Sequence, residues 1–563
     1  MIHRLLILLL VVVLAVGVRA QTPAKTTDDT TGTISGRVVN DSGQPLAGAL
    51  LFARPMNSLA TPRSTTSDAD GNFRLIGLEP ALYTINATAP AYATDNTVAL
   101  TTYYRLGDSI NLEMVRGGVI TGTVTNNTGD PVIGVRVRAV RIRDAKGQAS
   151  RIPSFGLEQP TDDRGVYRIY GLLPGTYLVS AGGGGGISPS FNPYDSDVPT
   201  YSPSSTRDNA AEITVQSGED STADIHYRGE PGYSISGTVK IAATSGATVT
   251  LRAAGNPVPL AATFQPPNAR GFAFNGLGDG EYTLRAQENV SNIAQFATSA
   301  TKRITIKGAN VTGLELVPTP LASISGRVVL EPSKPPACEG KRAPLLAEML
   351  VQLQRPEKDI EDEDGIYVGP LGGYASPDPS GALVWRNVRP GKYRFEPRFY
   401  ARYWYLQSIA MNKTGAKPQK IDAAANWTIT KSGDQLSNVI ITIAQGAASL
   451  RGRLTLAEGA MVQAGTNLYL IPAEPDKATD LLRYFVTEVS VDGTFALNNL
   501  PPGKYLALIQ ANVDGPISTQ AKLREPETDT ATARAKLRRA AETKKTEIEL
   551  KPCQNLTNYQ LKQ

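Results

Sequence analysis

A five-fold internal repeat constrains the fold of this chain more than any other feature. Each copy contains an apolar residue and a tyrosine ten positions later, with a turn that contains proline or glycine between them. The five pairs are Phe73 and Tyr83, Tyr167 and Tyr177, Phe272 and Tyr282, Leu383 and Tyr393, and Phe495 and Tyr505. A spacing that is kept in all five copies indicates repeated structural units of one kind.

The residues of each copy predict a β-hairpin followed by a tight return. In the first copy, Asp70-Gly71 supplies the positive φ angle that a hairpin turn requires, and Phe73 begins an alternation of apolar and polar residues. Pro-Gly pairs such as Pro174-Gly175 favour a β-turn. The closing tyrosine then begins another strand, so each copy contributes several short strands.

A second pattern precedes each hairpin and predicts the opening strand of each unit. It places an apolar residue two positions before a glycine, as in Ile34-Ser35-Gly36, Ile120-Thr121-Gly122, Ile235-Ser236-Gly237, Ile324-Ser325-Gly326 and Leu450-Arg451-Gly452. With the hairpin, each unit reads as about seven short strands, which is typical of an antiparallel β-sandwich. The predicted fold class is therefore all-β, with about five antiparallel Greek-key β-sandwich modules in tandem and a short C-terminal helical segment.

The repeat also predicts the domain boundaries of the 563-residue chain. The second module carries a Gly/Ser/Pro-rich loop, the fourth carries insertions, and the fifth ends in a surface helix within 525–543 and a strand over 547–550. We expect a signal peptide over 1–20, a linker over 21–31, and sandwiches over 32–117, 118–230, 231–320, 321–446 and 447–563.

The N-terminus predicts export to the periplasm or the cell exterior. A basic start at Arg4, an apolar run over 5–16 and small residues up to Ala20 are typical of a secretory signal peptide. No second hydrophobic span follows, so we expect no transmembrane segment after cleavage. Removal of Arg4 and Arg19 lowers the formal net charge from +5 to +3, which does not favour a nucleic-acid partner.

These patterns carry a family resemblance. The combination of Ile-Ser-Gly-x-Val, Gly-x-Pro-x-x-Gly-Val, Asp-x-x-Gly-x-Tyr and Leu-Pro-Gly-x-Tyr resembles the carboxypeptidase regulatory-like domain, a transthyretin-like sandwich also grouped with starch-binding-like and collagen-adhesin B-type folds. The resemblance is strongest in the first two units, and Arg270 replaces the hairpin glycine in the third. It implies a non-catalytic accessory or stalk domain of exported bacterial proteins. The lysine–asparagine cross-links of the adhesin relatives are not expected here, because Lys240 is the only candidate lysine in the opening strands.

The sequence assigns no catalytic, cofactor or metal site. After signal cleavage the single histidine is His226, which rules out a histidine-based triad and a multi-histidine metal centre. The stretch Asp68–Asn72 resembles a short calcium loop, but it lacks the distal glutamate and the hairpin turn explains it. A glycosidase needs only two carboxylates, yet nothing in the sequence places two acids in one pocket.

The densest aromatic cluster offers two interpretations. It contains Tyr400, Tyr403, Trp404 and Tyr405. Exposed on a sheet, these side chains would form a ligand surface that stacks on sugar rings; alternatively, alternate members fill the core of the fourth module.

The two cysteines, Cys338 and Cys553, are expected to form a disulfide between the insertion of the fourth module and the C-terminal strand, with two isolated thiols as the alternative.

The junctions between modules are short and poor in flexible residues, as in 317–323, so the sequence predicts a semi-rigid rod.

The predicted function is an exported, non-catalytic repeat protein that acts as a scaffold, spacer or binding protein, with a glycan or a cell-envelope protein as the expected partner. A carbohydrate-binding protein that uses exposed aromatic residues is the alternative, and a hydrolase with an unrecognised carboxylate site is a remote one.

Overall fold

The computed structural model describes residues 32–56, 62–94, 102–150, 158–183, 192–242, 244–254, 259–289, 296–356, 373–413, 419–456, 462–463, 465–511 and 531–562. The predicted signal peptide and linker, residues 1–20 and 21–31, lie outside this part of the chain.

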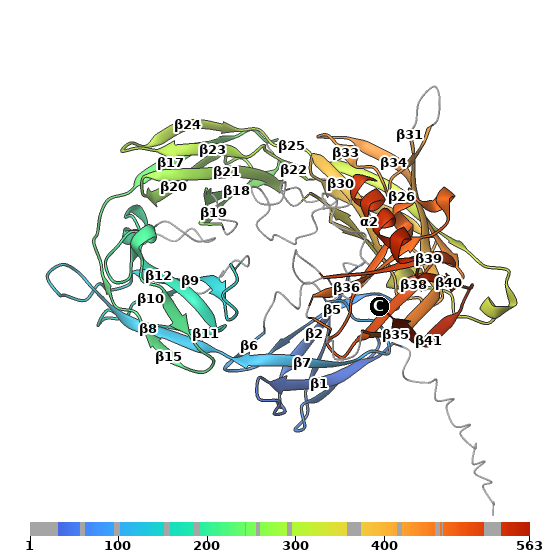
Figure 1. Ribbon diagram of the computed structural model, residues 1–563. Helices are drawn as coiled ribbons and strands as arrows, with labels where there is room; N and C mark the ends of the chain where they lie inside the picture. The colour runs from blue at the N-terminus through green and yellow to red at the C-terminus, as the bar shows by residue number, and fades with distance from the viewer. Residues whose placement is uncertain are drawn as a thin grey trace, which may run out of the picture.

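The chain forms five β-sandwiches in succession, called modules 1 to 5 below, so the predicted fold class is confirmed (Figure 1). The domain boundaries given above stay a prediction. Module 1 contains β1 (Ile34–Asn40), β2 (Leu50–Pro55), β3 (Arg63–Thr66), β4 (Asn72–Leu75), β5 (Tyr83–Thr88), β6 (Tyr92–Ala93) and β7 (Ser109–Arg116). Module 2 contains β8 (Gly118–Thr125), β9 (Arg136–Asp144), β10 (Glu158–Pro160), β11 (Val166–Leu172), β12 (Gly175–Ala181), η1 (Pro193–Ser196), β13 (Thr200–Tyr201), η2 (Arg207–Asn209), β14 (Ile213–Val215), β15 (Asp220–Thr222) and β16 (Ile225–His226).

The remaining modules follow the same plan. Module 3 contains β17 (Tyr233–Val239), β18 (Gly246–Ala253), β19 (Ala261–Gln265), β20 (Gly271–Leu277), β21 (Gly280–Asn289), β22 (Ala297–Thr298), β23 (Lys302–Ile306) and β24 (Val311–Leu316), followed by β25 (Thr319–Pro320). Module 4 contains β26 (Ala322–Glu331), η3 (Pro336–Cys338), η4 (Leu346–Glu348), β27 (Leu350–Gln354), β28 (Tyr374–Ala375), β29 (Ala382–Val388), β30 (Gly391–Arg398), β31 (Trp404–Lys413), β32 (Gln419–Asp422), β33 (Thr428–Thr430) and β34 (Gln435–Gln445). Module 5 contains β35 (Ala448–Thr455), β36 (Thr466–Pro472), η6 (Pro475–Lys477), η7 (Leu481–Arg483), β37 (Phe485–Glu488), β38 (Thr494–Leu500), β39 (Gly503–Ala511), α2 (Ala531–Lys544), β40 (Glu547–Leu550) and β41 (Asn555–Lys562).

Each module contains at least one parallel strand pair, which the prediction of antiparallel modules did not include. The opening strand lies between the hairpin strand, to which it is antiparallel, and the last strand, to which it is parallel. The parallel pairs among the described residues are β1 with β7, β8 with both β15 and β16, β17 with β24, β26 with β34, and β35 with β41. The last strand returns from the other sheet and starts beside the beginning of the opening strand, so it runs in the same direction.

The parallel pair explains why each opening strand has a glycine at the repeated position. A Cβ atom built on Gly326 would lie 2.4 Å from the carbonyl oxygen of Val439 on the neighbouring strand. The corresponding distances are 2.0 Å at Gly36, 2.3 Å at Gly122, 2.1 Å at Gly237 and 2.1 Å at Gly452. Only a residue without Cβ lets the two backbones approach this closely.

The repeated apolar residues form the core of each sandwich. The apolar residue two positions before each opening glycine is fully buried, and the five residues that begin the repeated ten-position spacing are buried as well. Each module has its own hydrophobic cluster, and a smaller cluster lies beneath α2 on β36 and β39. The predicted C-terminal helix and the strand over 547–550 are therefore confirmed as α2 and β40.

The five closing tyrosines make one shared hydrogen bond that the sequence analysis did not identify. Each hydroxyl donates to the backbone carbonyl four residues earlier, which pins the turn to the strand that follows it, as in a tyrosine corner. The donor–acceptor pairs are Tyr83 to Glu79 (2.7 Å), Tyr177 to Leu173 (2.7 Å), Tyr282 to Gly278 (2.8 Å), Tyr393 to Arg389 (2.9 Å) and Tyr505 to Pro501 (2.8 Å). The same hydrogen bond in each module therefore explains the constant spacing in the sequence.

The predicted semi-rigid rod is wrong, because the array curves back on itself. Figure 1 shows the five sandwiches arranged around a closed course, with module 1 next to the C-terminal modules. The Arg105 guanidinium of module 1 donates to the carbonyl of Tyr400 in module 4 and lies 4.9 Å from the centre of its ring. The rings of Tyr103 and Tyr374 also meet edge to face across this contact, 6.2 Å apart. The array is therefore curved rather than straight, and the stiffness of the junctions stays a prediction.

We predict that Gly326→Ala lowers the free energy of unfolding of module 4 by about 3 kcal/mol, because the added methyl group overlaps backbone atoms that are fixed by strand pairing. All three tryptophans of the chain, Trp385, Trp404 and Trp427, lie in module 4, so tryptophan fluorescence during urea unfolding reports on this module. Ser325→Ala in the same strand is the matched control and should change stability by less than about 0.5 kcal/mol. Equal stability of the two variants would contradict the close-approach argument.

We also predict that stability falls as the pH rises from about 10 to about 12. Burial raises the pKa of Tyr177 to about 12 and that of Tyr282 to about 12, and burial also raises the pKa of Tyr83. Unfolded tyrosine ionises near pH 10, so above this value the unfolded state releases protons that the folded state retains. The stabilisation is therefore complete below about pH 10 and is lost above it.

Circular dichroism and the ultraviolet absorbance of phenolate, recorded on the same samples, test this dependence. Loss of β-structure should accompany phenolate formation in one step. The Tyr282→Phe variant should show a shallower dependence of stability on pH between about 10 and 12. Ionisation of all 22 tyrosines near pH 10 with the β-structure retained would contradict the prediction.

Candidate functional site

Modules 4 and 5 are joined by direct contacts between the end of one sandwich and a corner of the next. The Asn499 carboxamide in module 5 donates to the carbonyls of Ala401 (2.6 Å) and Trp404 (2.7 Å) in module 4. Leu482 of η7 packs into the core of module 4. These contacts hold the segment between β30 and β31 against module 5.

Asn499 occupies a corner that has a left-handed backbone in every module. Its φ angle is +57°, and the equivalent residues are Gly77, Gly171, Gly276 and Asn387. Asparagine tolerates this conformation better than most residues and, unlike glycine, adds a side chain that can bind a neighbour. Asn387 uses this property at the previous junction, where its carboxamide oxygen accepts a hydrogen bond from the Phe296 amide (2.7 Å).

The predicted aromatic ligand surface is not one continuous surface in the structure. Trp404 is only 3% exposed, belongs to the core of module 4 and donates its indole N–H to the carbonyl of Arg342 (3.2 Å). Tyr403 and Tyr405 are half-buried, and Tyr400 is 37% exposed and lies at the contact with module 1. The four side chains therefore do not form the flat stacking platform that was the basis of the carbohydrate hypothesis.

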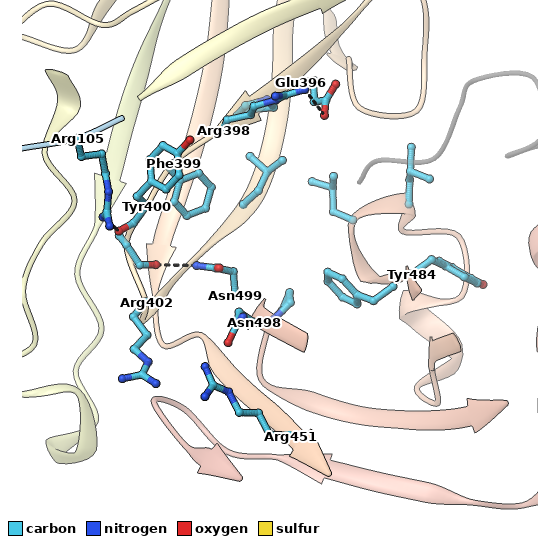
Figure 2. A pocket seen from close by; sticks show the side chains of 17 residues that line it. Arg105, Glu396, Arg398, Phe399, Tyr400, Arg402, Arg451, Tyr484, Asn498 and Asn499 are labelled. Atoms are coloured by element: carbon cyan, nitrogen blue, oxygen red, sulfur yellow. Dashed lines mark hydrogen bonds and ion pairs between the residues drawn. The ribbon is translucent and has the colours of Figure 1, made fainter. Parts of the chain in front are cut away.

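A cavity of about 450 Å³ lies where modules 1, 4 and 5 meet (Figure 2). Module 1 contributes Arg105, module 4 contributes the segment 396–402 and Leu406, and module 5 contributes residues from β35, η7 and the β38 corner. The aromatic and aliphatic part of the lining consists of Phe399, Tyr400, Leu406, Leu481, Leu482, Tyr484 and Phe485. The volume is in the range of sites that hold small molecules.

The charged lining of this cavity is mainly basic. Among the described residues of the lining, Arg105, Arg398, Arg402 and Arg451 are the arginines, and Glu396 is the only carboxylate. Glu396 is buried, where it accepts a hydrogen bond from the Gln354 carboxamide and lies 3.7 Å from the guanidinium of Arg398. The carboxylate is therefore already engaged, and the remaining guanidinium groups give the cavity a positive field.

This lining is suited to recognition rather than to acid–base chemistry. Guanidinium groups donate hydrogen bonds to carboxylates and phosphates, and they do not lose their proton in proteins. The exposed side chain of Asn498 adds a carboxamide. Glycoside hydrolysis requires two carboxyl groups on opposite sides of the bond to be cleaved, whereas one carboxylate lines this cavity.

Outside this cavity, the residues that were considered as possible catalytic or metal-binding groups form hydrogen bonds within the fold. The Nδ1 atom of His226 lies 3.0 Å from the hydroxyl of Thr125 on the neighbouring strand. The Asp68 carboxylate accepts hydrogen bonds from the amides of Asp70 (3.0 Å) and Asn72 (2.8 Å), as expected of a turn. Among the described residues, no group of three or more His, Cys, Asp or Glu side chains could hold a metal ion.

Sequence reasoning found only part of this site. It singled out Tyr400, whose neighbour Arg402 lies in the same aromatic cluster, but it gave no role to Arg105, Arg451 or Asn499. The only local signal was the asparagine in a corner where other modules have glycine. The arginines carry no such signal, because module packing alone brings them together.

The sulfur atoms of Cys338 and Cys553 are bonded in the structure, with the Cα atoms 5.4 Å apart. Cys338 belongs to η3 of module 4, and Cys553 lies between β40 and β41 of module 5, where its amide donates to the carbonyl of Gly446. The bond closes a loop of 215 residues and fixes the two modules to each other.

We predict that the double variant Cys338→Ser/Cys553→Ser is less stable than the oxidised protein by about 5 kcal/mol, the value of the chain-entropy model for a loop of this length. Tryptophan fluorescence during urea unfolding should show a lower midpoint for module 4. The wild-type chain in reductant should behave like the double variant, and in oxidising buffer it should show no free thiol. Two titratable thiols in the oxidised, denatured chain would contradict the pairing.

Comparison with known proteins identifies one module. Residues 33–112 match the family model of the carboxypeptidase regulatory-like domain, and no curated protein matches the chain. A minor pilin of Streptococcus agalactiae is 13% identical over 35% of this chain and 96% of its own, with a TM-score of 0.20. Two B repeat units of the collagen binding protein of Staphylococcus aureus are 13% identical over 74% of this chain and 100% of their own, with a TM-score of 0.13. These scores are too low to support an argument, so the assignment depends on the family model and the strand order. Residues 33–112 form a carboxypeptidase regulatory-like domain, and four further β-sandwiches follow it in the chain.

Proposed function

We propose that this chain is an exported, non-catalytic scaffold and binding protein that works as a closed frame of five β-sandwiches. The observation that carries the proposal is the contact between module 1 and module 4, which turns a tandem array into one body. A frame of this kind presents loops and corners of different modules at fixed positions, as a scaffold requires.

The contacts between modules support a stiff frame. Modules 1 and 2 are linked by the Ser217 hydroxyl, which donates to the Asp41 carboxylate (2.7 Å). Modules 3 and 4 share the hydrogen bond of Asn387, and modules 4 and 5 share the hydrogen bonds of Asn499 and the disulfide. Bonds at successive junctions limit the hinge motion that is the default for domains on a linker.

Export is supported by two independent features. Residues 1–20 have the pattern of a signal peptide, and the pair Cys338–Cys553 is of the kind that persists in oxidising compartments. No helix in the described part of the chain combines the length and the apolar character needed to cross a membrane.

A non-catalytic role is supported by the chemistry of the cavity between modules 1, 4 and 5, where guanidinium, carboxamide and aromatic groups surround one engaged carboxylate. Carbohydrate binding through Tyr400, Tyr403, Trp404 and Tyr405 is the weaker alternative, because Trp404 is buried in the core of module 4. A glycan array with the Trp404→Ala variant as control separates the two.

Mass spectrometry of fractionated producer cells tests the export part of this proposal. We expect the chain outside the cytoplasm, with Gln21 as its first residue and a disulfide-linked peptide pair that contains Cys338 and Cys553. A cytoplasmic chain that keeps its first 20 residues and has free thiols would contradict export.

Cross-linking in intact cells tests the scaffold part. A partner recovered with the wild-type chain should be recovered with the exposed-site control Arg386→Ala but should be lost with Arg105→Ala/Tyr400→Ala/Tyr103→Ala, which removes the hydrogen bond and both ring contacts between modules 1 and 4. Solution scattering should show a larger maximum dimension for this triple variant only. Equal partner recovery from all three chains, or turnover of a substrate by the purified protein, would contradict the proposal.

A further inference from the structure

Two arginines from different modules converge at the cavity between modules 1, 4 and 5. Arg402 lies in the connection between β30 and β31 of module 4, and Arg451 lies on β35 of module 5. Both are exposed, and both line the cavity. Figure 2 shows both side chains in the lower part of the view, on the same side of the cavity.

Neither guanidinium group is used by the fold. Within the described part of the chain, the side chains of Arg402 and Arg451 make no hydrogen bond and no ion pair. The only acidic side chain of the lining, Glu396, is bound to Gln354 and faces Arg398 instead. The cavity thus carries two guanidinium groups that no described side chain neutralises, so both are available to bind an anion.

We propose that this cavity binds an anionic ligand whose carboxylate or phosphate group lies between Arg402 and Arg451. Planar guanidinium groups match such oxyanions through paired N–H···O hydrogen bonds, and two of them from different modules hold one group in a defined orientation. The role goes beyond that of a scaffold and rests on the closed arrangement of modules in the proposed function.

The rest of the cavity indicates the kind of ligand. The Asn498 side chain is exposed at the wall and offers both a donor and an acceptor. Phe485 and Tyr400 add partly exposed aromatic surface on the module 5 and module 4 sides. A compact ligand with one oxyanion and several hydroxyl groups fits these features, and both an acidic sugar and a free organic acid have this chemistry.

The site also depends on the closed arrangement of modules. Its walls come from three modules, and Asn499 fixes the backbone next to Arg402 through the carbonyl of Ala401. The disulfide between Cys338 and Cys553 holds modules 4 and 5 together. The oxidised, closed chain is therefore the binding form.

Isothermal titration of the full oxidised chain tests the proposal with four probes: inorganic phosphate, citrate, trigalacturonate and neutral maltotriose. We expect at least one anionic probe to bind, maltotriose not to bind, and the affinity to fall as salt is added. Arg402→Gln and Arg451→Gln should each weaken binding at least about tenfold. The control Arg386→Gln removes the same charge from an exposed position on β29 and should leave binding unchanged.

The relative affinities identify the source of the oxyanion. Tighter binding of trigalacturonate than of citrate points to an acidic sugar, and the reverse order points to a free organic acid. Absence of binding by all three anionic probes, or equal affinity in the wild type and both cavity variants, would overturn the proposal. Either result would leave the export and cross-linking experiments unaffected, so the two proposals fail separately.

Thermal melting provides a second readout. Without ligand, Arg402→Gln and Arg451→Gln should melt at the wild-type temperature or above it, because neither substitution breaks a hydrogen bond or ion pair of the described residues. The binding anion should raise the melting temperature of the wild type but not that of the two variants. A lower melting temperature of both variants without ligand would show that the arginines are structural and would overturn the proposal.

Discussion

The parallel pairing of the first and last strands of each module is the constraint on which the rest of the structure depends. Two parallel neighbours run in the same direction, so the chain enters a sandwich at one end and leaves it at the other. Modules built in this way must follow one another end to end. The pairing is as close as it is because the opening residue is glycine: at Gly326, a Cβ atom would overlap the backbone of β34.

The corners of the sandwiches then decide how the modules meet. Each corner is pinned by the tyrosine hydrogen bond and contains a residue with a left-handed backbone. At Asn387 and Asn499 the side chain of this residue also binds the previous module. A residue that forms the turn therefore also fixes the angle between modules, and several such angles in succession bring Arg105 onto Tyr400.

Closure of the array has a functional consequence. The cavity between modules 1, 4 and 5 does not exist in any single module, and its arginines come from all three. A small β-sandwich offers little concave surface of its own, because its two sheets are filled by the core. Packing several sandwiches around a closed course creates concave surface at the junctions. Charged side chains can line this surface without being buried in the hydrophobic core of a module.

The sequence by itself determined the number and type of the modules. A local turn and one hydrogen bond set the spacing between Tyr167 and Tyr177 and its four counterparts. The spacing can therefore be recognised in the sequence alone. The sequence also drew attention to Cys338 and Cys553, the only two cysteines of the chain. The tertiary structure decided what depends on residues far apart: the parallel pairs, the burial of Trp404, the closed course in place of a rod, and the cavity that both Arg402 and Arg451 line. These follow from the angles between rigid modules, and small side-chain contacts such as those of Asn499 set these angles without leaving a periodic signal in the sequence.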